Sequence, residues 1–214
     1  MIKRSDITGL ILAGGRGQRI HGRDKGLMDY QGQPLVHWVI ERLKPQVGTV
    51  LISANRCVPE YHRFGWPLLF DDIPDHAGPL AGLSRGLECS RTPWILMVPC
   101  DGPYVPFNLA IRLANTIETE KVPAAVASDG HQTHFTYAML SRSLLEDLQA
   151  YLASGERRLG AWLNRHSTAV ADFSDNRLAF INLNTTEDFK QANSINQSKP
   201  GAPMCFPSSK ELLL

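Results

Sequence analysis

Short apolar runs alternate with amphipathic stretches along roughly the first half of the chain. The apolar runs are rich in Ile, Val and Leu and are bounded by Gly, Pro, Asp or Ser, which predicts buried strands. The amphipathic stretches repeat apolar side chains at helical spacing, as Leu35, Val39 and Leu43 do. This alternation is typical of βαβ units around a parallel sheet. The predicted strands are 7–13, 47–53, 67–70 and 94–98, and the predicted helices are 34–44, 60–64, 78–89 and 107–119.

The pattern changes after residue 120. The stretches 124–128 and 133–139 flank the turn Asp129-Gly130, which predicts a hairpin. Helices and short strands follow without the regular βαβ alternation. The predicted elements are strands 124–128, 133–139, 168–172 and 179–182, and helices 142–153, 156–165 and 185–193.

These elements predict an α/β fold built on a mostly parallel sheet, with a small antiparallel part in the second half of the chain. No repeat or linker divides residues 1–193, so we expect a single domain there. Residues 194–214 carry three prolines and no apolar periodicity, which is typical of a disordered tail.

Charge and cysteine usage narrow the class of protein. The chain has 22 basic and 21 acidic side chains, whereas a non-specific binder of nucleic acid or anionic membranes would carry a basic excess. The four cysteines form no CxxC pair and are expected to be reduced thiols, three of them in packed elements. The apolar run near the N-terminus is too short for a signal peptide or a membrane span. We therefore expect a cytoplasmic protein that binds neither nucleic acid nor membrane.

Polar and charged residues follow each predicted strand of the first half. Ligands of open parallel sheets bind outside the carboxyl ends of the strands, so these residues are expected to gather at one edge. Glycines, cations and carboxylates together suit an anionic ligand bound with a divalent cation. They are Gly14, Gly15, Arg16, Arg19 and Lys25 after the first strand, Ser53 and Asn55 after the second, Asp71 and Asp72 after the third, and Asp101 after the fourth.

The glycine- and arginine-rich loop 14–32 has a composition suited to phosphate. Gly14 and Gly15 let backbone N–H groups approach an anion closely. The loop is neither a dinucleotide-binding loop nor a Walker A loop, because Ile20 stands at the last glycine position of GxGxxG and no Gly-Lys-Ser/Thr follows.

The stretch LILAGGRGQRIHGRDKG at 10–26 resembles the signature LAGG-x-x-x-R-x-x-x-x-K of nucleotidyltransferases with a Rossmann-like domain, with five residues instead of four between Arg19 and Lys25. Its ending, Asp24-Lys25-Gly26, resembles the molybdenum cofactor guanylyltransferases. The resemblance extends from about residue 7 to 190 and implies a three-layer Rossmann-like nucleotidyltransferase fold, with nucleotide bound by the N-terminal half and the acceptor by the C-terminal half. Further matching pieces are Asn55-Arg56, Asp71, GPLAG at 78–82, PCDGPY at 99–104, GERR at 155–158 and NLNT at 182–185.

The resemblance also implies roles for individual residues. Lys25, Asp101 and Arg19 would be catalytic, with Asp101 holding the metal. The family often has Asn where this chain has Ser53, so either Ser53 or Asn55 would contact the nucleotide. The implied nucleotide-binding residues are Leu12, Ala13, Gly14, Gly15, Lys25, Ser53, Asn55, Asp71, Gly78 and Asp101, and the implied acceptor-binding residues are Arg157, Arg158, Asn182 and Asn184.

The implied reaction transfers GMP from GTP to the terminal phosphate of molybdopterin and releases pyrophosphate. The implied cofactor is Mg²⁺, for which Mn²⁺ can substitute. A phosphate nucleophile is already ionised at neutral pH, so positioning and charge neutralisation carry such a reaction. We expect a monomer. The sequence leaves open whether the protein also binds molybdenum-insertion proteins and molybdoenzymes.

Other interpretations compete with this one. Another nucleotidyltransferase, a molybdenum cofactor cytidylyltransferase or a sugar- or polyol-phosphate nucleotidyltransferase, would share most of these residues. A second class is a non-catalytic module that binds GTP or delivers the cofactor. Among single residues, Asp101 could cap a helix and Arg157-Arg158 could form a solvated helix face. His131 and His134 lie three positions apart in sequence, but without a third ligand nearby a zinc site is disfavoured.

Overall fold

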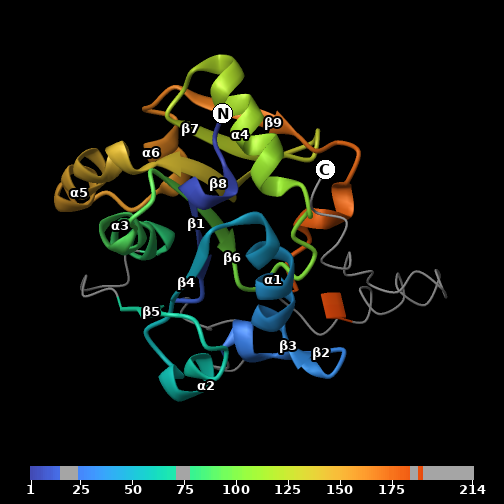
Figure 1. The fold of residues 1–214 in the computed structure, drawn as a ribbon. Coiled ribbons are helices and arrows are strands. Elements are labelled where there is room, and N and C mark those ends of the chain that lie inside the picture. Colours follow the sequence, from blue (N-terminus) through green and yellow to red (C-terminus); the bar gives the residue numbers. More distant parts are fainter. Residues whose placement is uncertain (15–23, 71–77, 184–187, 190–214) are drawn as a thin grey trace.

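A seven-stranded sheet runs through the protein in the order β5-β4-β1-β6-β8-β7-β9 (Figure 1). The computed structural model describes residues 1–14, 24–70, 78–183 and 188–189. The sheet confirms the α/β class predicted from the apolar runs. Its strands are β1 (Ile7–Leu12), β4 (Thr49–Ser53), β5 (Leu68–Leu69), β6 (Trp94–Pro99), β7 (Ala124–Ser128), β8 (Thr133–Ser141) and β9 (Thr168–Asp172).

Strand directions create a switch point beside β1. β5, β4, β1 and β6 are parallel, whereas β8 runs antiparallel to both β6 and β7, as expected for the second half. From β1 the chain builds the sheet outward through β4 and β5, and then returns to place β6 on the other side of β1. The carboxyl ends of β1 and β6 are in register, with Leu12 opposite Pro99. Ligands of such sheets bind where the strand order reverses, which here is beyond Leu12 and Pro99.

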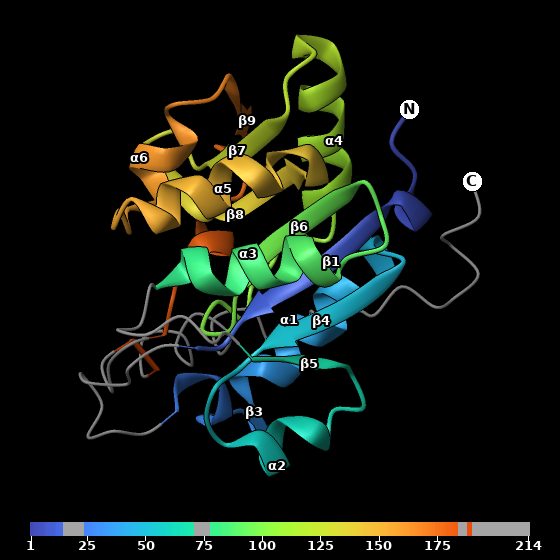
Figure 2. The ribbon, with the colours of Figure 1, turned by 90° about the vertical axis from the view of Figure 1, so that its left-hand side faces the viewer.

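Helices cover both faces of the sheet (Figure 2). Alternate residues of β1 enter the two cores: Ile11 belongs to the core that includes residues of α1 and α4, and Leu10 to the core that includes residues of α3, α5 and α6. This is the period of two expected of a strand buried on both faces. Within the described residues, no helix is long and apolar enough to cross a membrane. The helices are α1 (Leu35–Leu43), α2 (Val58–His62), α3 (Pro79–Cys89), α4 (Leu109–Glu120), α5 (Leu145–Ala153) and α6 (Leu159–Leu163).

Two glycines let α3 lie close to the sheet. A Cβ at Gly86 would stand 2.6 Å from Cδ2 of Leu10, and one at Gly82 would stand 2.6 Å from Oγ of Ser53. Both distances are shorter than atoms tolerate, so α3 packs over the ends of β1 and β4 only because these side chains are missing.

The predicted strand 179–182 is wrong. A 3-10 helix, η5 (Arg177–Phe180), is followed by an irregular segment through Leu183. The backbone N–H of Leu183 donates to the carbonyl of Asp101 at 2.9 Å, and Ile181 and Leu183 pack near Tyr30. The segment therefore crosses the carboxyl ends of the strands instead of extending the sheet.

Several smaller expectations also change. A two-stranded hairpin connects the predicted loop to α1: β2 (Asp29–Tyr30) lies inside the loop, and β3 (Gln33–Pro34) follows it, so the predicted helix 34–44 begins at Leu35. The turn residues Gln31 and Gly32 have φ angles of 55° and 78°. The predicted helix 156–165 is shorter and becomes α6. Most of the predicted helix 185–193 and all of the predicted tail lie outside the described residues.

The expected packing of three cysteines is wrong. Cys57 and Cys89 are exposed and Cys100 is buried. Cys57 has a left-handed backbone just before α2, and Cys89 is the last residue of α3. A position at the start or the end of a helix therefore did not bring these two side chains into the core.

Candidate active site

The glycine loop leaves β1 from a fixed point. The N–H of Ala13 donates to the carbonyl of Ser53 at 2.8 Å, and the N–H of Cys100 donates to the carbonyl of Leu12 at 3.1 Å. The last residues of β1 are thus bonded to both neighbouring strands, and Gly14 is exposed just beyond them. Gly15 and Arg19 lie outside the described residues. The arrangement directs the start of the loop into the switch point of the sheet.

Lys25 and Asp101 meet beyond the carboxyl ends of β1 and β6. Nζ of Lys25 lies 3.3 Å from Oδ2 of Asp101, and the side chains are 27% and 12% exposed. Lys25 begins the 3-10 turn η2 (Lys25–Leu27), and Asp101 follows β6 by two residues. Asp101 is not the cap of α4, because Asn108 holds that position. The structure therefore brings together a cation and a carboxylate that the sequence assigned to phosphate and metal.

The turn that carries Lys25 is held from both sides. Oδ1 of Asp24 accepts hydrogen bonds from the N–H of Gly26 at 3.1 Å and from the hydroxyl of Tyr61 at 2.6 Å. Burial raises the pKa of Asp24 above its ordinary value, and the Tyr61 and Gly26 hydrogen bonds act in the opposite direction. Tyr61 has no distinguishing signal in the sequence, because in the amphipathic pattern it is only another apolar helix position.

Asp101 is also bound to the segment that carries one predicted acceptor residue. Leu183 donates to the Asp101 carbonyl, and a Cβ built on Gly102 would stand 3.2 Å from Oδ1 of Asn182 and overlap the hydroxyl of Tyr137. Asn182 and Asp101 therefore belong to one site.

Tyr137 is a second residue that the sequence analysis missed. Its side chain is buried, and its hydroxyl has no hydrogen-bond partner among the described residues. Burial raises the pKa of Tyr137, and the negative charge of Asp101 raises it further, so the phenol stays protonated. No local pattern distinguishes it from the other apolar positions of β8.

Ser53 and Asn55 differ in exposure. The Ser53 side chain is 2% exposed and faces α3 at Gly82, whereas Asn55 is exposed beyond the end of β4. Gly78, the N-cap residue of α3, has a φ of 65° and a ψ of −148°, a conformation that favours glycine. Asp71, predicted beside them, lies outside the described residues.

The predicted acceptor arginines are on the surface. Arg157 and Arg158 are exposed and precede α6. Nη1 of Arg157 donates to the carbonyls of Leu152 and Glu156, both at 2.8 Å. Gly160 at the start of α6 packs beside Phe135, near the start of β8. Because β8 is antiparallel to β6, the start of α6 lies toward the edge of the sheet where β6 ends. Asn184 lies outside the described residues.

The carboxylate of Asp101 is an oxygen donor of the kind that hard divalent cations prefer. Among the described residues, no three His, Cys, Asp or Glu side chains come together as metal ligands. His134 instead hydrogen-bonds Asp129, with Nε2 2.9 Å from Oδ2. A metal on Asp101 would take its other ligands from phosphate oxygens and water, which is the usual coordination of Mg²⁺ and not of structural Zn²⁺.

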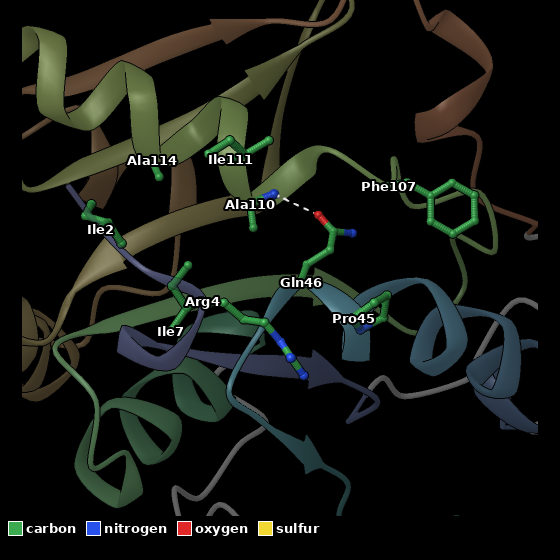
Figure 3. Close-up of a pocket in the computed structure, with 9 residues that line it drawn as sticks. All are labelled: Ile2, Arg4, Ile7, Pro45, Gln46, Phe107, Ala110, Ile111 and Ala114. Atoms are coloured by element: carbon green, nitrogen blue, oxygen red, sulfur yellow. Dashed lines mark hydrogen bonds between the residues drawn. The ribbon is translucent and has the colours of Figure 1, made fainter. Parts of the chain in front are cut away.

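An apolar groove of about 310 Å³ lies away from this site (Figure 3). Ile7 begins β1 and Gln46 precedes β4, so these lining residues mark the amino ends of the strands, opposite to Asp101. Phe107 and Ile111 add apolar surface to its wall, and Gln46 bonds the backbone of Ala110 (Figure 3). Among the described residues that line it, the cationic side chain is that of Arg4, whose Nε donates to the carbonyl of Val47.

The mostly parallel sheet and the Lys25–Asp101 pair beside its switch point fit a nucleotidyltransferase. The family model described as MobA-like NTP transferase domain matches residues 9–170. The chain belongs to this family, and its relatives place it among the molybdenum cofactor guanylyltransferases. It is 45% identical to a protein of that name from Cupriavidus necator, over 89% of this chain and 98% of the relative. It is 40% identical to another from Shewanella sediminis, over 86% and 94%.

Solved structures share the fold. The molybdopterin-guanine dinucleotide biosynthesis protein A from Archaeoglobus fulgidus has a TM-score of 0.75 and 21% identity, over 90% of this chain and all 100% of that one. A 2-C-methyl-D-erythritol 4-phosphate cytidylyltransferase from Thermus thermophilus has a TM-score of 0.67 and 15% identity, over 88% and 98%. At these identities the likeness concerns the fold alone.

Proposed function

We propose that this protein transfers GMP from GTP to the terminal phosphate of molybdopterin, forming a guanine dinucleotide cofactor and pyrophosphate. The observation that carries the proposal is the Lys25–Asp101 pair at the switch point of the sheet. The relatives named molybdenum cofactor guanylyltransferase supply the identity of the nucleotide and of the acceptor.

In this proposal the triphosphate lies over the end of β1. The backbone of Leu12, Ala13 and Gly14 approaches the nucleotide, and the sequence continues into Gly15 and Arg19. Lys25 neutralises phosphate oxygens that become more negative as pyrophosphate departs. Asp71, Gly78 and Asn55 shape the nucleoside side, and the burial of Ser53 favours Asn55 for the direct contact.

Asp101 is the proposed metal ligand. A Mg²⁺ ion on this carboxylate, or Mn²⁺ in its place, would reduce the repulsion between two polyanions. The carboxylate is 12% exposed, so it is accessible to a ligand while its backbone is fixed by Leu183.

The acceptor is proposed to bind on the side of Asn182, with Arg157, Arg158 and Asn184 as further contacts. An oxygen of its terminal phosphate attacks the α-phosphorus of GTP in line. A new O–P bond forms, the bond from the α-phosphorus to the β-phosphate oxygen breaks, and pyrophosphate leaves with the electron pair. No general base is required, so positioning and charge neutralisation carry the reaction.

Thermal unfolding with Mg²⁺ and each of GTP, CTP, ATP and UTP tests the nucleotide, and pyrophosphate release with molybdopterin tests the reaction. A nucleotide at one hundred times its Kd stabilises the fold by about 2.7 kcal/mol. We expect this gain with GTP and much smaller gains with the others. Equal gains with CTP would favour a cytidylyltransferase, and GTP binding without pyrophosphate release would favour a binding module.

A further inference from the structure

We propose that Tyr61 is a positioning residue for nucleotidyl transfer, which acts through Asp24 to hold the Lys25 ammonium at Asp101. The inference rests on the proposed function. It adds to the site a residue of α2 that is distant in sequence from the glycine loop.

The hydrogen bonds fix the residues on both sides of Lys25. The Tyr61 hydroxyl donates to Oδ1 of Asp24 at 2.6 Å, across 37 positions of sequence. The same oxygen accepts from the N–H of Gly26 and is the side-chain cap of η2. Lys25 therefore lies between two residues whose positions depend on one carboxylate oxygen, and Tyr61 connects that oxygen to the core.

The packing around Gly26 locates the turn against Asp101. A Cβ at Gly26 would overlap the Tyr61 hydroxyl and stand 3.2 Å from Sγ of Cys100. Tyr61 thus occupies the space beside Gly26, and Gly26 contacts the residue that precedes Asp101. Tyr61 is 0% exposed and Cys100 is 7% exposed, so this contact is part of the packed interior. The packing of Gly26 and the hydrogen bonds of Asp24 together explain why these two residue types flank Lys25.

The charge state of the pair argues for a role of the hydroxyl beyond filling space. Burial makes the ionised form of Asp24 unfavourable and raises its pKa, and the bond from Tyr61 is the largest opposing effect. Burial also raises the pKa of Tyr61, so its hydroxyl stays a donor at neutral pH. A short bond to a carboxylate is stronger than one between neutral groups. A phenylalanine would fill the same core volume but could not hold Asp24 in this way.

A double-mutant cycle with Tyr61→Phe and Lys25→Ala separates positioning from general stability. Misplacement of a catalytic group by about 1 Å can cost on the order of 100-fold, so we expect Tyr61→Phe to lower kcat/KM for GTP about 10- to 100-fold. In the Lys25→Ala background the same change should cost less than about threefold, because coupled residues are not additive. Equal factors in both backgrounds would overturn the proposal.

Thr8→Val is the matched control. Thr8 is 1% exposed, and its hydroxyl bonds that of Thr92 at 2.8 Å near the amino end of β1, far along the strand from Leu12. Removing this buried hydroxyl should leave kcat/KM within about twofold of the wild type, since distant sites act independently. If Tyr61→Phe behaves like Thr8→Val, the hydroxyl of Tyr61 has no positioning role.

Substitutions of Asp24 test the same contact without altering the core. Asn keeps an oxygen that accepts from Tyr61 and Gly26, so Asp24→Asn should retain more activity than Asp24→Ala, which should lose at least as much as Tyr61→Phe. Equal losses in the two Asp24 variants would assign the effect to charge and overturn the proposal, even if Tyr61→Phe failed to fold.

Wild-type pyrophosphate release is measured first. If it is absent, the proposed function is overturned together with the role of Tyr61. If the enzyme is active and the effects of Tyr61→Phe and Lys25→Ala are additive, only the role of Tyr61 is overturned.

Discussion

Nζ of Lys25 lies 3.3 Å from Oδ2 of Asp101, although 76 positions of sequence separate the two residues. Each charge neutralises the other within a site that the sheet forms at its switch point. A nucleoside triphosphate and its cation would offer each group a partner of higher charge. When substrate binds, Lys25 would therefore pair with phosphate and Asp101 with the cation, in place of each other. This relationship leads to the first two predictions.

Lys25→Ala should reduce both turnover and nucleotide affinity. Loss of one preorganised charge at a transition state typically costs on the order of 10²–10³ in rate. The measurement is pyrophosphate release at saturating substrates, with GTP affinity from calorimetry. Lys44→Ala is the control, because Lys44 is exposed and bonds Glu41 on the surface of α1. Unchanged turnover in Lys25→Ala would remove this lysine from the site.

Asp101→Asn should fold normally but lose most transfer activity. The amide keeps the size of the carboxylate and loses the charge that a hard divalent cation prefers. We expect residual GTP affinity that no longer depends on Mg²⁺, and activity restored in part, if at all, only at high Mg²⁺. Pyrophosphate release across a magnesium titration measures this. The exposed Asp175, which pairs with Arg112, gives a matched Asp→Asn control. A wild-type magnesium dependence in Asp101→Asn would show that Asp101 is not a metal ligand.

Gly102→Ala should destabilise the protein by about 1–3 kcal/mol, the usual cost of overpacking a core. The new methyl group would overlap the Tyr137 hydroxyl beside Asp101. Adding Tyr137→Phe removes that oxygen and should recover part of the loss, so the two changes should be non-additive in denaturant unfolding. Equal stabilities of Gly102→Ala and Gly102→Ala/Tyr137→Phe would show that the hydroxyl is not the obstacle.

Asp24→Asn should gain stability relative to the wild type as pH rises from about 4 to 7. The pKa of Asp24 is raised by burial in the folded state, so at low pH both states hold the proton. As pH rises through the ordinary pKa of 3.8 and then the raised folded pKa, the unfolded chain loses its proton first, and the wild type is progressively destabilised. Asn does not titrate and lacks this penalty. Urea unfolding of both proteins across this range provides the check, and a difference that stays constant or changes in the opposite direction contradicts the assigned pKa shift.

Local patterns in the sequence were sufficient for most of the architecture. Each strand of the parallel half is an apolar run, because a strand covered on both faces must be apolar throughout. Helix periodicity identified α1, α3 and α4 for a similar reason. Lys25 and Asp101 could also be chosen, since both follow apolar strands and match a known signature. The sequence could assign both side chains to the carboxyl edge of the sheet, but no local pattern gives the distance between them.

Long-range packing decided what the sequence analysis missed or misassigned. Segment 179–182 has strand-like composition, yet its neighbour Leu183 bonds the Asp101 carbonyl and draws the chain across the sheet edge. Tyr61 and Tyr137 look like ordinary apolar positions, and only the packing of segments far apart in sequence places their hydroxyls beside Asp24 and Gly102. Periodicity reports which face of an element is buried, because burial is governed by the side chain's own polarity. The partner of a buried hydroxyl depends on the order and register of strands far apart in sequence, and the tertiary structure alone determines these.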